Sequence, residues 1–310
     1  MSEDGVHLHR AIVLERPRYK AGPSTWVGHI PFAFWIVEQL RPRLLVELGT
    51  YNGCSYCAFC QAVDRLKLST ACYAVDTWKG DAHSGSYPEV VFDALAAYHD
   101  AHYRAFSTLL RTSFDEASTH FADGTVDLLH IDGYHTYEAV SHDFETWRPK
   151  LSSRAVVLLH DTNVRALDFG VWRFWEEMTR RHPGFAFLHS CGLGVLAVGD
   201  DVPEAVRWLV EDRAAAPDRD AMIRDFFERL GTFTQAEAEL RFATELMGDP
   251  SDPASQASQV RVYRAQMFAA QAEVESMRAS KSWRVTAPLR RLYALASGIR
   301  AAARSTSRPR

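Results

Sequence analysis

The sequence predicts an open α/β domain with a doubly wound, mostly parallel sheet, followed by a helical C-terminal extension. Three short runs rich in apolar and β-branched residues indicate strands: Leu44 to Leu48, Val126 to Ile131 and Ala155 to Leu159. A polar cluster and then a helical pattern follow each run, which is typical of βα units in a parallel sheet that is buried on both faces. Strands that alternate with helices in this way favour the α/β class.

Further elements complete the predicted sheet. In chain order they are a strand at Cys72 to Asp76, a helix between Ser86 and Thr108, a short strand near Leu109 and Leu110, and an amphipathic helix at Phe169 to His182. The stretch Phe185 to Gly199 predicts an antiparallel hairpin that closes the sheet, with Gly192 and Gly194 in its turn. We expect the sheet domain to end there.

The chain is expected to divide into four segments. They are an N-terminal helical or lid segment at 1–43, the sheet domain at 44–200, a helical extension at 201–280 and a basic tail at 281–310. The extension is rich in Ala, Glu, Arg and Gln, which favour helices over strands. Within it, residues 256–280 contain a short heptad pattern that suits equally a homodimeric coiled coil or a helix lying on its own domain.

Charge is unevenly distributed along the chain. The net charge is −4, yet nine arginines and lysines, and no acid, follow Glu275. Within 281–310, apolar residues line one helical face opposite arginines, which suits an anionic membrane surface, or else a helix that is solvated or packed on its own domain. The acidic remainder has no basic face with interleaved aromatics, so we expect no nucleic-acid partner.

Cysteine usage and apolar runs indicate the compartment. Five cysteines, an odd number, fit a reducing environment better than a disulfide framework. The first ten residues lack the basic head and apolar centre of a secretory signal, and the longest apolar stretch, Trp26 to Leu40, is too short and too polar to span a bilayer. We therefore expect a cytoplasmic protein, with any membrane binding peripheral and at the inner face of the cell membrane.

The stretch VELGTYNGCSYCAFCQAV, residues 46–63, contains Cys54, Cys57 and Cys60 at C-x2-C-x2-C spacing. This spacing suggests a zinc or iron–sulfur site, but a closed tetrahedral zinc site needs four ligands, and the other two cysteines lack paired spacing. On a helix, positions i, i+3 and i+6 share one face, and cysteine packs like a small apolar residue. We therefore favour packing into the core over metal binding.

The same stretch also contains the pattern E-x-G-x-x-x-G, formed by Glu47, Gly49 and Gly53. Gly49 allows a sharp turn and a close approach to a ligand, and Gly53 allows the next helix to begin close to the strand. Asp76 ends the following strand, where a carboxylate can accept both hydroxyls of a ribose. The glycine spacing differs from the dinucleotide fingerprint, so the predicted ligand is a nucleoside without a pyrophosphate.

Four stretches resemble class I S-adenosylmethionine-dependent methyltransferases, and more narrowly the branch associated with bacterial glycan biosynthesis. They are LLVELGTYNGCSYCAFCQAV, YAVDTWKGDAHSGSY, VDLLHIDGYHTYEAVSHDFETWRPKL and VVLLHDT, and the likeness extends roughly from His29 to Gly199. It implies a Rossmann-like methyltransferase fold and S-adenosylmethionine as cofactor. It also implies a hydroxyl acceptor, on a sugar of a surface glycan or its lipid-linked precursor.

The resemblance further implies which residues bind the cofactor. They are Glu47, Gly49, Thr50, Gly53, Asp76, Trp78, Ser113 and Asp132. Glu47, Gly49 and Gly53 are implied to line the methionine part of the cofactor. Asp76 is implied to hold its ribose, and Trp78 and Ser113 are implied to lie near its adenine. Trp78 also fits a core aromatic. The loop His83 to Tyr87 is expected to help form the acceptor pocket, since such pockets are built from loops.

Two carboxylates and two imidazoles are expected to meet beside the cofactor. Asp132 and His135 follow one strand, and His160 and Asp161 end the next, and open α/β sheets bind ligands at the carboxyl ends of their strands. A sugar hydroxyl reacts poorly unless a base removes its proton or a cation binds its oxygen. We predict His135 as the base, with Asp132 as the second catalytic residue.

A divalent ion, magnesium or another, is an open possibility at this site. The D-x-x-H spacing of Asp132 and His135 is similar to that of metal-dependent macrolide-sugar O-methyltransferases, in which the Asp binds magnesium and the His takes the proton. Those relatives carry two adjacent carboxylates after the fifth strand, whereas His160 precedes Asp161 here. Imidazole weakens a magnesium site or selects another metal. The predicted ligands are Asp132, Asp161 and His160, and the alternative for His160 and His130 is that they only fix loop geometry.

Two other functions fit parts of the sequence. His130, Asp132 and His160 could form the two-histidine, one-carboxylate iron site of an oxygenase, although His130 is expected to lie deeper in the sheet. The chain could also be a non-catalytic adaptor in a glycan-assembly complex that keeps a methyltransferase-like fold. The joint presence of Glu47, Asp76, Asp132 and His135 argues against an adaptor.

Overall fold

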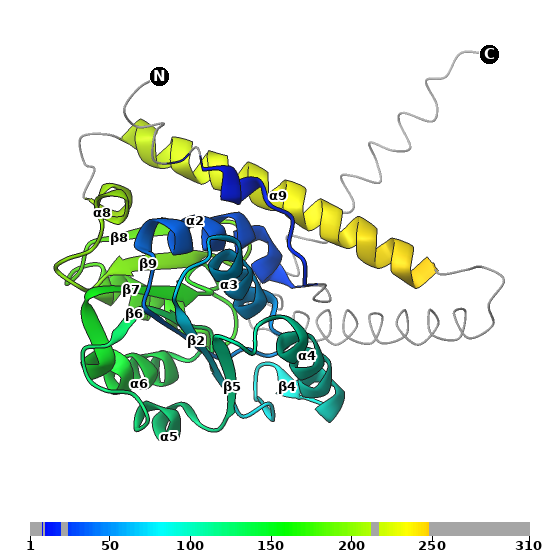
Figure 1. Cartoon of the computed structure of the whole chain (residues 1–310). Helices are drawn as coiled ribbons and strands as arrows, with labels where there is room; N and C mark the ends of the chain where they lie inside the picture. Colours follow the sequence, from blue (N-terminus) through cyan, green and yellow to red (C-terminus); the bar gives the residue numbers. More distant parts are fainter. Residues whose placement is uncertain (1–7, 9, 20–23, 212–216, 248–310) are drawn as a thin grey trace, which may run out of the picture. The chain divides into compact units, whose positions relative to one another are not determined.

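A seven-stranded, mostly parallel sheet forms the centre of the computed structural model, which describes residues 8, 10–19, 24–211 and 217–247. The strand order is β5-β2-β1-β6-β7-β9-β8 (Figure 1). The strands are β1 Leu44–Leu48, β2 Ala71–Asp76, β5 Ser107–Arg111, β6 Val126–Ile131, β7 Leu151–His160, β8 Gly184–Phe187 and β9 Leu193–Ala197. Neighbouring strands from β5 to β7 are parallel, and β9 is antiparallel to both β7 and β8.

Helices cover both faces of this sheet, with α2 and α3 on one face and α5 and α6 on the other (Figure 1). The helices are α2 Ile30–Leu40, α3 Cys54–Arg65, α4 Glu89–His102, α5 Phe114–Ser118, α6 Tyr137–Trp147, α7 Val171–Met178, α8 Glu204–Val210 and α9 Pro217–Met247. Shorter elements are the 3-10 turns η1 Ala11–Leu14, η2 Thr25–His29 and η3 Arg148–Lys150, and the paired strands β3 Gly80–Asp81 and β4 Gly85–Ser86.

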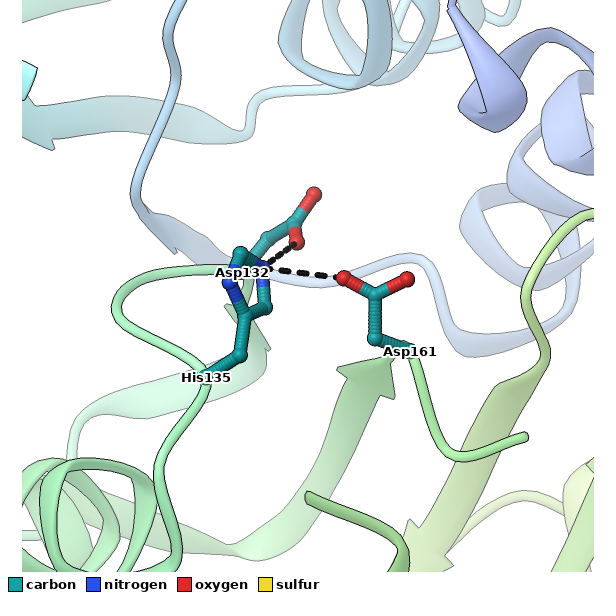
Figure 2. A group of neighbouring side chains, drawn as sticks. All are labelled: Asp132, His135 and Asp161. Carbon is teal, nitrogen blue, oxygen red and sulfur yellow. Dashed lines mark ion pairs between the residues drawn. The ribbon is translucent and has the colours of Figure 1, made fainter. Parts of the chain in front are cut away.

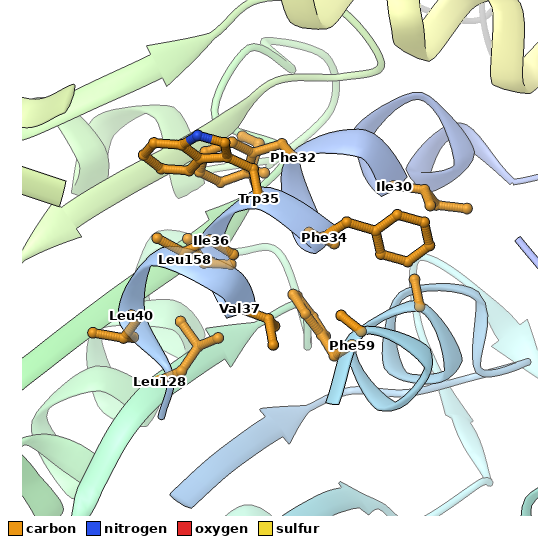
Figure 3. Packing of buried hydrophobic residues seen from close by; sticks show 14 of the residues in the cluster. Ile30, Phe32, Phe34, Trp35, Ile36, Val37, Leu40, Phe59, Leu128 and Leu158 are labelled. Atoms are coloured by element: carbon orange, nitrogen blue, oxygen red, sulfur yellow. The ribbon is translucent and has the colours of Figure 1, made fainter. Parts of the chain in front are cut away.

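Alternate residues of the central strands enter two separate hydrophobic clusters. Leu128 and Leu158 pack near α2 (Figure 3), whereas Leu129 and Leu159 belong to the cluster on the opposite face. This follows because successive side chains of a strand point to opposite faces. The sheet is therefore buried on both sides, as the continuous apolar runs predict, and only its strand ends are open to ligands.

The structure confirms the expected strands and corrects two details. The apolar run at Ala155 belongs to a strand that begins earlier, at Leu151, because a bulge lets Leu151 pair with Val126 through a polar segment that carries no strand signal. Gly194 lies inside β9 and not in the hairpin turn, which contains Gly192 at φ +89°. A Cβ atom at Gly194 would approach the Trp175 ring to 2.4 Å, so packing and not turn geometry requires this glycine.

The helices after β9 pack into the same core as α2. Val206 and Leu209 of α8, and Phe227 of α9, are buried in the cluster that contains α2. The ring centroids of Phe32 and Phe227 are 5.4 Å apart. Residues up to Phe242 form one compact unit with the sheet, and the predicted boundaries at 43, 200 and 280 stay predictions.

The predicted coiled-coil segment 256–280 and the basic tail 281–310 lie outside the described residues. Among the helices that the structure does describe, none combines the length and the apolar character that crossing a bilayer requires. The three clustered cysteines lie on α3, where Cys54, Cys57 and Cys60 are buried in the hydrophobic core, which agrees with the packing interpretation.

Candidate active site

The turn after β1 is held against the end of β6 by its glycines. Gly49 has φ +86°, and a Cβ atom there would lie 2.1 Å from the backbone oxygen of Asp132. Gly53 has φ +81°, and its Cβ atom would lie 2.3 Å from Leu95. Other residues adopt positive φ with difficulty, and here they would also collide with a neighbour. The two glycines therefore bring the start of α3 close to the strand ends.

Asp76, at the end of β2, anchors this turn through its carboxylate. One carboxylate oxygen accepts the backbone N–H groups of Thr50 and Tyr51, both at 2.9 Å, and the other accepts the N–H of Trp78 at 2.7 Å. Asp76 also lines a cavity of about 240 Å³, together with Ser113. The structure therefore places two of the predicted nucleoside-binding residues on one cavity.

Trp78 lies in a different environment from Ser113. Its side chain is buried, its indole N–H donates to the carbonyl of Tyr51 at 2.8 Å, and it packs edge-on against Phe92. It is absent from the described lining of the 240 Å³ cavity. These contacts fit the alternative of a core aromatic, and an adenine contact for Trp78 stays a prediction.

Glu47 is fully buried and forms a hydrogen-bonded chain with two residues. The indole N–H of Trp26 donates to Nε2 of His130 at 3.2 Å, and Nδ1 of His130 lies 2.8 Å from Oε2 of Glu47. Because an indole N–H only donates, His130 is neutral and donates from Nδ1. Both its nitrogens are thus occupied, which leaves no lone pair for the iron site of an oxygenase.

The second carboxylate oxygen of Glu47, Oε1, is buried and has no partner at hydrogen-bond distance within the described part of the chain, although the side chain of Ser55 also acts to lower the pKa of Glu47. Burial raises the pKa of Glu47, and the hydrogen bond from His130 opposes that shift. A buried acceptor without a partner costs free energy. An N–H donor supplied by a ligand would remove this cost, so Glu47 fits a role in binding the amino group of a cofactor.

Asp132, His135, His160 and Asp161 meet at the carboxyl edge of β6 and β7, as predicted. They line a second cavity of about 170 Å³. Nε2 of His135 lies 2.9 Å from Oδ2 of Asp161 and 3.7 Å from Oδ1 of Asp132 (Figure 2). Gly49, Tyr51 and Asp132 line both cavities, which are therefore adjacent.

His160 is an imidazolium in this arrangement. Its Nε2 lies 3.2 Å from the carbonyl oxygen of Ser190, and its Nδ1 lies 3.3 Å from Asp132 and 3.4 Å from Asp161. Each nitrogen faces only acceptors, so both carry protons. Burial alone would lower the pKa of His160, but the two carboxylates raise it well above its usual value.

His135 has the same carboxylate neighbours but is less enclosed. Burial would lower the pKa of His135, yet interactions with Asp132 and Asp161 raise it to about 9. The pKa of Asp132 is held well below its ordinary value despite burial, mainly by the charge of His160. The cluster is therefore close to electrically neutral when both histidines are protonated, and negative once His135 loses its proton.

The ligand atoms that could bind a metal ion together belong to Asp132, His135 and Asp161, all within 4.8 Å of one another. His160, the predicted third ligand, uses both nitrogens as donors and has no lone pair to offer. Its assignment as a ligand stays a prediction, and the geometry favours His135 in that place. The backbone of Asp161 adopts φ +60°, a strained conformation that is often found at functional sites.

Several residues that the sequence analysis did not single out also line the two cavities. Phe114 and Tyr134 join Ser113 and Asp132 around the larger one. Trp26, from η2, lines the smaller one. Phe114 and Tyr134 directly neighbour predicted residues along the chain, which is a usable signal. Trp26 belongs to the predicted N-terminal segment, and the sequence alone gives no register that would place it at the site.

Comparison with known proteins covers the part of the chain that contains Asp76, Asp132 and His135 but not Trp26. Residues 46–162 match the family model Methyltransf_24, described as a methyltransferase domain. This match covers 117 of the 310 residues of the chain. With its mostly parallel seven-stranded sheet, flanking helices and helical C-terminal part, the chain has a Rossmann-like methyltransferase fold.

The chain is also similar to a longer bacterial protein and to solved structures. The "Uncharacterized protein y4gI" of Sinorhizobium fredii (strain NBRC 101917 / NGR234) is 44% identical over 235 residues, which cover 71% of this chain and 26% of that protein. The chain thus spans about a quarter of that relative's length. The methyltransferase PaMTH1 of Podospora anserina, solved with SAH, is 13% identical, covering 54% of this chain and 76% of its own, with a TM-score of 0.43. The O-methyltransferase TomG of Streptomyces achromogenes, solved with SAM, is 14% identical, covering 63% and 90%, with a TM-score of 0.42.

Proposed function

We propose that this chain transfers a methyl group from S-adenosylmethionine to a hydroxyl group of a sugar, in a surface glycan or its lipid-linked precursor. One arrangement supports methyl transfer above all: two adjacent cavities share Gly49, Tyr51 and Asp132. Asp76 lines one of them and His135 the other. A nucleoside cofactor would therefore lie beside an acid–base group. The sugar acceptor rests on the resemblance of the four sequence stretches.

Glu47 and Asp76 suit the two ends of this cofactor. The buried Oε1 of Glu47 has no partner at hydrogen-bond distance among the described residues and would accept an N–H from the methionine amino group. The carboxylate of Asp76, already held by three backbone N–H groups, keeps acceptor capacity for ribose hydroxyls. When bound, S-adenosylmethionine supplies an electrophilic methyl group on a sulfonium sulfur.

His135 is the best-placed base of the site. When the side chain is neutral with its lone pair on Nε2, that nitrogen can take the proton of an acceptor hydroxyl in the smaller cavity. Asp161 and Asp132, at 2.9 Å and 3.7 Å, then stabilise the imidazolium that forms. His160, already cationic, keeps both carboxylates ionised and in place.

Asp132, His135 and Asp161 would hold a divalent ion, which would supply Lewis acidity to an acceptor oxygen. Nε2 of His135 has a single lone pair and cannot bind an ion and take a proton at once. Metal dependence therefore separates two roles for His135. Without an ion it is the base, and with one it is a ligand.

Two measurements on the full chain test the proposal. Isothermal titration with S-adenosylmethionine is expected to give one-site binding, and absence of heat from folded protein would favour the non-catalytic adaptor. Incubation with methyl-labelled S-adenosylmethionine and fractionated cell glycans is expected to label a sugar fraction. Parallel reactions with EDTA, magnesium or manganese decide between the two roles of His135.

The parts of the chain outside the described residues carry proposals from sequence alone. We propose that residues 256–280 pair with a second copy of the chain and that residues 281–310 bind an anionic membrane surface from the cytoplasmic side. Light scattering of the full chain tests the first. Sedimentation with vesicles that contain or lack anionic lipid tests the second, and equal binding to both kinds of vesicle would contradict it.

A further inference from the structure

The two cavities described at the strand ends are small for the two substrates of the proposed reaction. Their volumes are about 170 Å³ and about 240 Å³, whereas a pocket that holds one drug-sized ligand typically measures about 300–1,000 Å³. S-adenosylmethionine is itself a ligand of that size, and a sugar acceptor must lie beside its methyl group. The wall of the site therefore has to open before both substrates can bind.

Two surface segments meet over His135. His83 lies between β3 and β4, whereas Asp168 and Phe169 lie in the loop between β7 and α7. Nε2 of His83 lies 2.6 Å from Oδ1 of Asp168. The Phe169 ring stacks on His83, with centroids 4.5 Å apart, and on His135, with centroids 4.7 Å apart. These contacts join the two segments and leave the His135 side chain only 17% exposed.

The loop 161–170 is fastened near both ends and held weakly between them. Near its start, the N–H of Asn163 donates to a carbonyl in the turn between β8 and β9, and at its end the N–H of Gly170 donates to the carbonyl of His135. Between these points, the described backbone–backbone hydrogen bonds stay within the loop, and most side chains are exposed. Side chains of α7, the next helix, also contact the loop. The middle of the loop can therefore open without disrupting the sheet.

The other segment, the ribbon Gly80–Ser86, is also attached weakly. Its strands β3 and β4 pair with each other in a separate two-stranded sheet, and most of its residues are exposed. The His83 side chain is only 8% exposed, because Tyr134 and Phe169 both pack on it with ring centroids 4.5 Å away. Segments with few buried contacts open at a low cost in free energy. The contacts of His83 therefore hold the ribbon against the loop.

We propose that the loop 161–170 and the ribbon Gly80–Ser86 form a cover over the acceptor site. The contacts of His83 with Asp168 and Phe169 hold this cover closed, and it opens to admit the sugar. The inference rests on the proposed function, because it concerns the same site. Loops that close over an active site keep water away from the reacting groups, and their opening often limits turnover. The strength of these contacts therefore sets how often the acceptor site is open.

Hydrogen exchange of the amides in residues 163–170 tests the cover without cofactor or acceptor. Asp168→Ala removes the group that accepts the His83 N–H, and exchange is expected to rise up to about fivefold, as for loss of an exposed pair. Phe169→Leu removes the ring stacking but keeps an apolar side chain, and exchange is expected to rise about two- to tenfold. Asp115→Ala is the control, because it breaks an exposed pair with His142 that lies outside the described linings of both cavities.

Exchange in β6 and β7 is expected to stay unchanged in both variants, because the central residues of these strands are buried in the core. Two outcomes would overturn the proposal. Native exchange rates in both variants would mean that these contacts do not hold the loop. A rise that is equal in the loop and in the two strands would mean that the variants only lower global stability.

A reversible cross-link tests whether opening of the cover admits the acceptor. Ala82→Cys and Leu167→Cys place thiols at exposed positions next to His83 and Asp168. Cys191→Ser removes the one cysteine of the five that is not buried. The full chain is loaded with methyl-labelled S-adenosylmethionine, joined by a cleavable bismaleimide and then mixed with fractionated cell glycans.

Glycan labelling is expected to stop after cross-linking and to return after cleavage of the linker, whereas chains with a single new cysteine stay active. Undiminished labelling by the fully cross-linked chain would overturn the proposal. Absence of labelling by the native chain would contradict the proposed methyl transfer instead, and the exchange experiment would still test the cover.

Discussion

At the scale of single residues, the carboxylates decide how the histidines of the site are protonated. His135 and His160 share Asp132 and Asp161 as neighbours, and both have a raised pKa. A backbone carbonyl on the far side of His160 fixes that ring as a donor, whereas Nε2 of His135 contacts only the side chains of Asp161 and Asp132 among the described ion pairs, and His135 is less enclosed. One histidine therefore supplies fixed charge, and the other can exchange a proton.

Replacing Asp161 by asparagine is expected to lower the pKa of His135. The native pKa is about 9, because the carboxylates outweigh burial. Loss of one charged neighbour should lower it by about 1–3 pH units, so the neutral base appears at lower pH. Titration of the His135 ring by NMR in the presence of EDTA measures this, with Asp115→Asn as the control. An unchanged titration midpoint of His135 in Asp161→Asn would show that Asp161 does not raise the pKa of His135.

Replacing Glu47 by glutamine is expected to weaken S-adenosylmethionine binding. Glutamine keeps one oxygen that accepts a hydrogen bond from His130, but it places an NH2 donor at the position of Oε1, where the N–H donor of the cofactor is expected to bind. About 1–3 kcal/mol of binding free energy should therefore be lost. Calorimetry measures the affinity. Glu145→Gln, at an exposed ion pair with Arg148, is the matched control. Equal affinity in the native chain and Glu47→Gln would remove Glu47 from the cofactor site.

At the scale of elements, the turn between β1 and α3 has little room for a larger side chain. Gly49→Ala combines strain at φ +86° with a Cβ atom 2.1 Å from the Asp132 backbone. Gly124→Ala has φ +71° but nothing within 4 Å, so it carries strain alone. We expect a loss of about 1 kcal/mol for Gly124→Ala and a larger loss for Gly49→Ala, together with weaker S-adenosylmethionine binding. Chemical denaturation measures the loss of stability, and calorimetry measures the binding. Equal losses of stability in Gly49→Ala and Gly124→Ala would argue against the close approach of the Gly49 turn to β6.

Helix α6 buries a carboxyl group whose charge opposes folding. Burial raises the pKa of Asp143 to about 7, with a smaller contribution from Asp115. A folded pKa above the unfolded one means that stability is greatest at acid pH and falls as pH rises through about 7. Asp143→Asn should therefore match the native stability near pH 4 and exceed it at pH 8, by up to about 4 kcal/mol. Urea denaturation at both pH values measures this, and a gain that is independent of pH would contradict it.

Sequence patterns predict the features that depend only on the sheet, which are the strand bounds and the residues at the strand ends. The bounds of β1 and β6 follow from runs buried on both faces, and the meeting of Asp132, His135, His160 and Asp161 follows from the common edge of parallel strands. The contact of His83 with His135 and Asp168 joins loops 52 and 85 residues apart. No periodicity constrains such loops, so the sequence could suggest the loop but not the contact.

At the scale of the whole molecule, helix α9, which follows β9, packs against an element that carries a residue of the site. Gly231 of α9 packs on η2, where a Cβ atom would lie 2.1 Å from the carbonyl oxygen of Gly28. The same 3-10 turn contains Trp26, which lines the smaller cavity and binds His130. The position of a cavity-lining residue thus depends on a helix that the strand pattern does not include.

A pair of truncations tests this dependence. Chain 1–242 keeps the whole compact unit, so we expect it to fold and to bind S-adenosylmethionine like the full chain. Chain 1–199 lacks Val206, Leu209, Ile223 and Phe227, which are all buried in the core. At roughly 1.5–3 kcal/mol for each buried side chain, their loss is comparable to the total stability of a typical domain, about 5–15 kcal/mol. We therefore expect chain 1–199 to be unfolded or aggregated by circular dichroism and size exclusion. A folded chain 1–199 that binds the cofactor with native affinity would instead place the boundary of the catalytic domain at the end of β9.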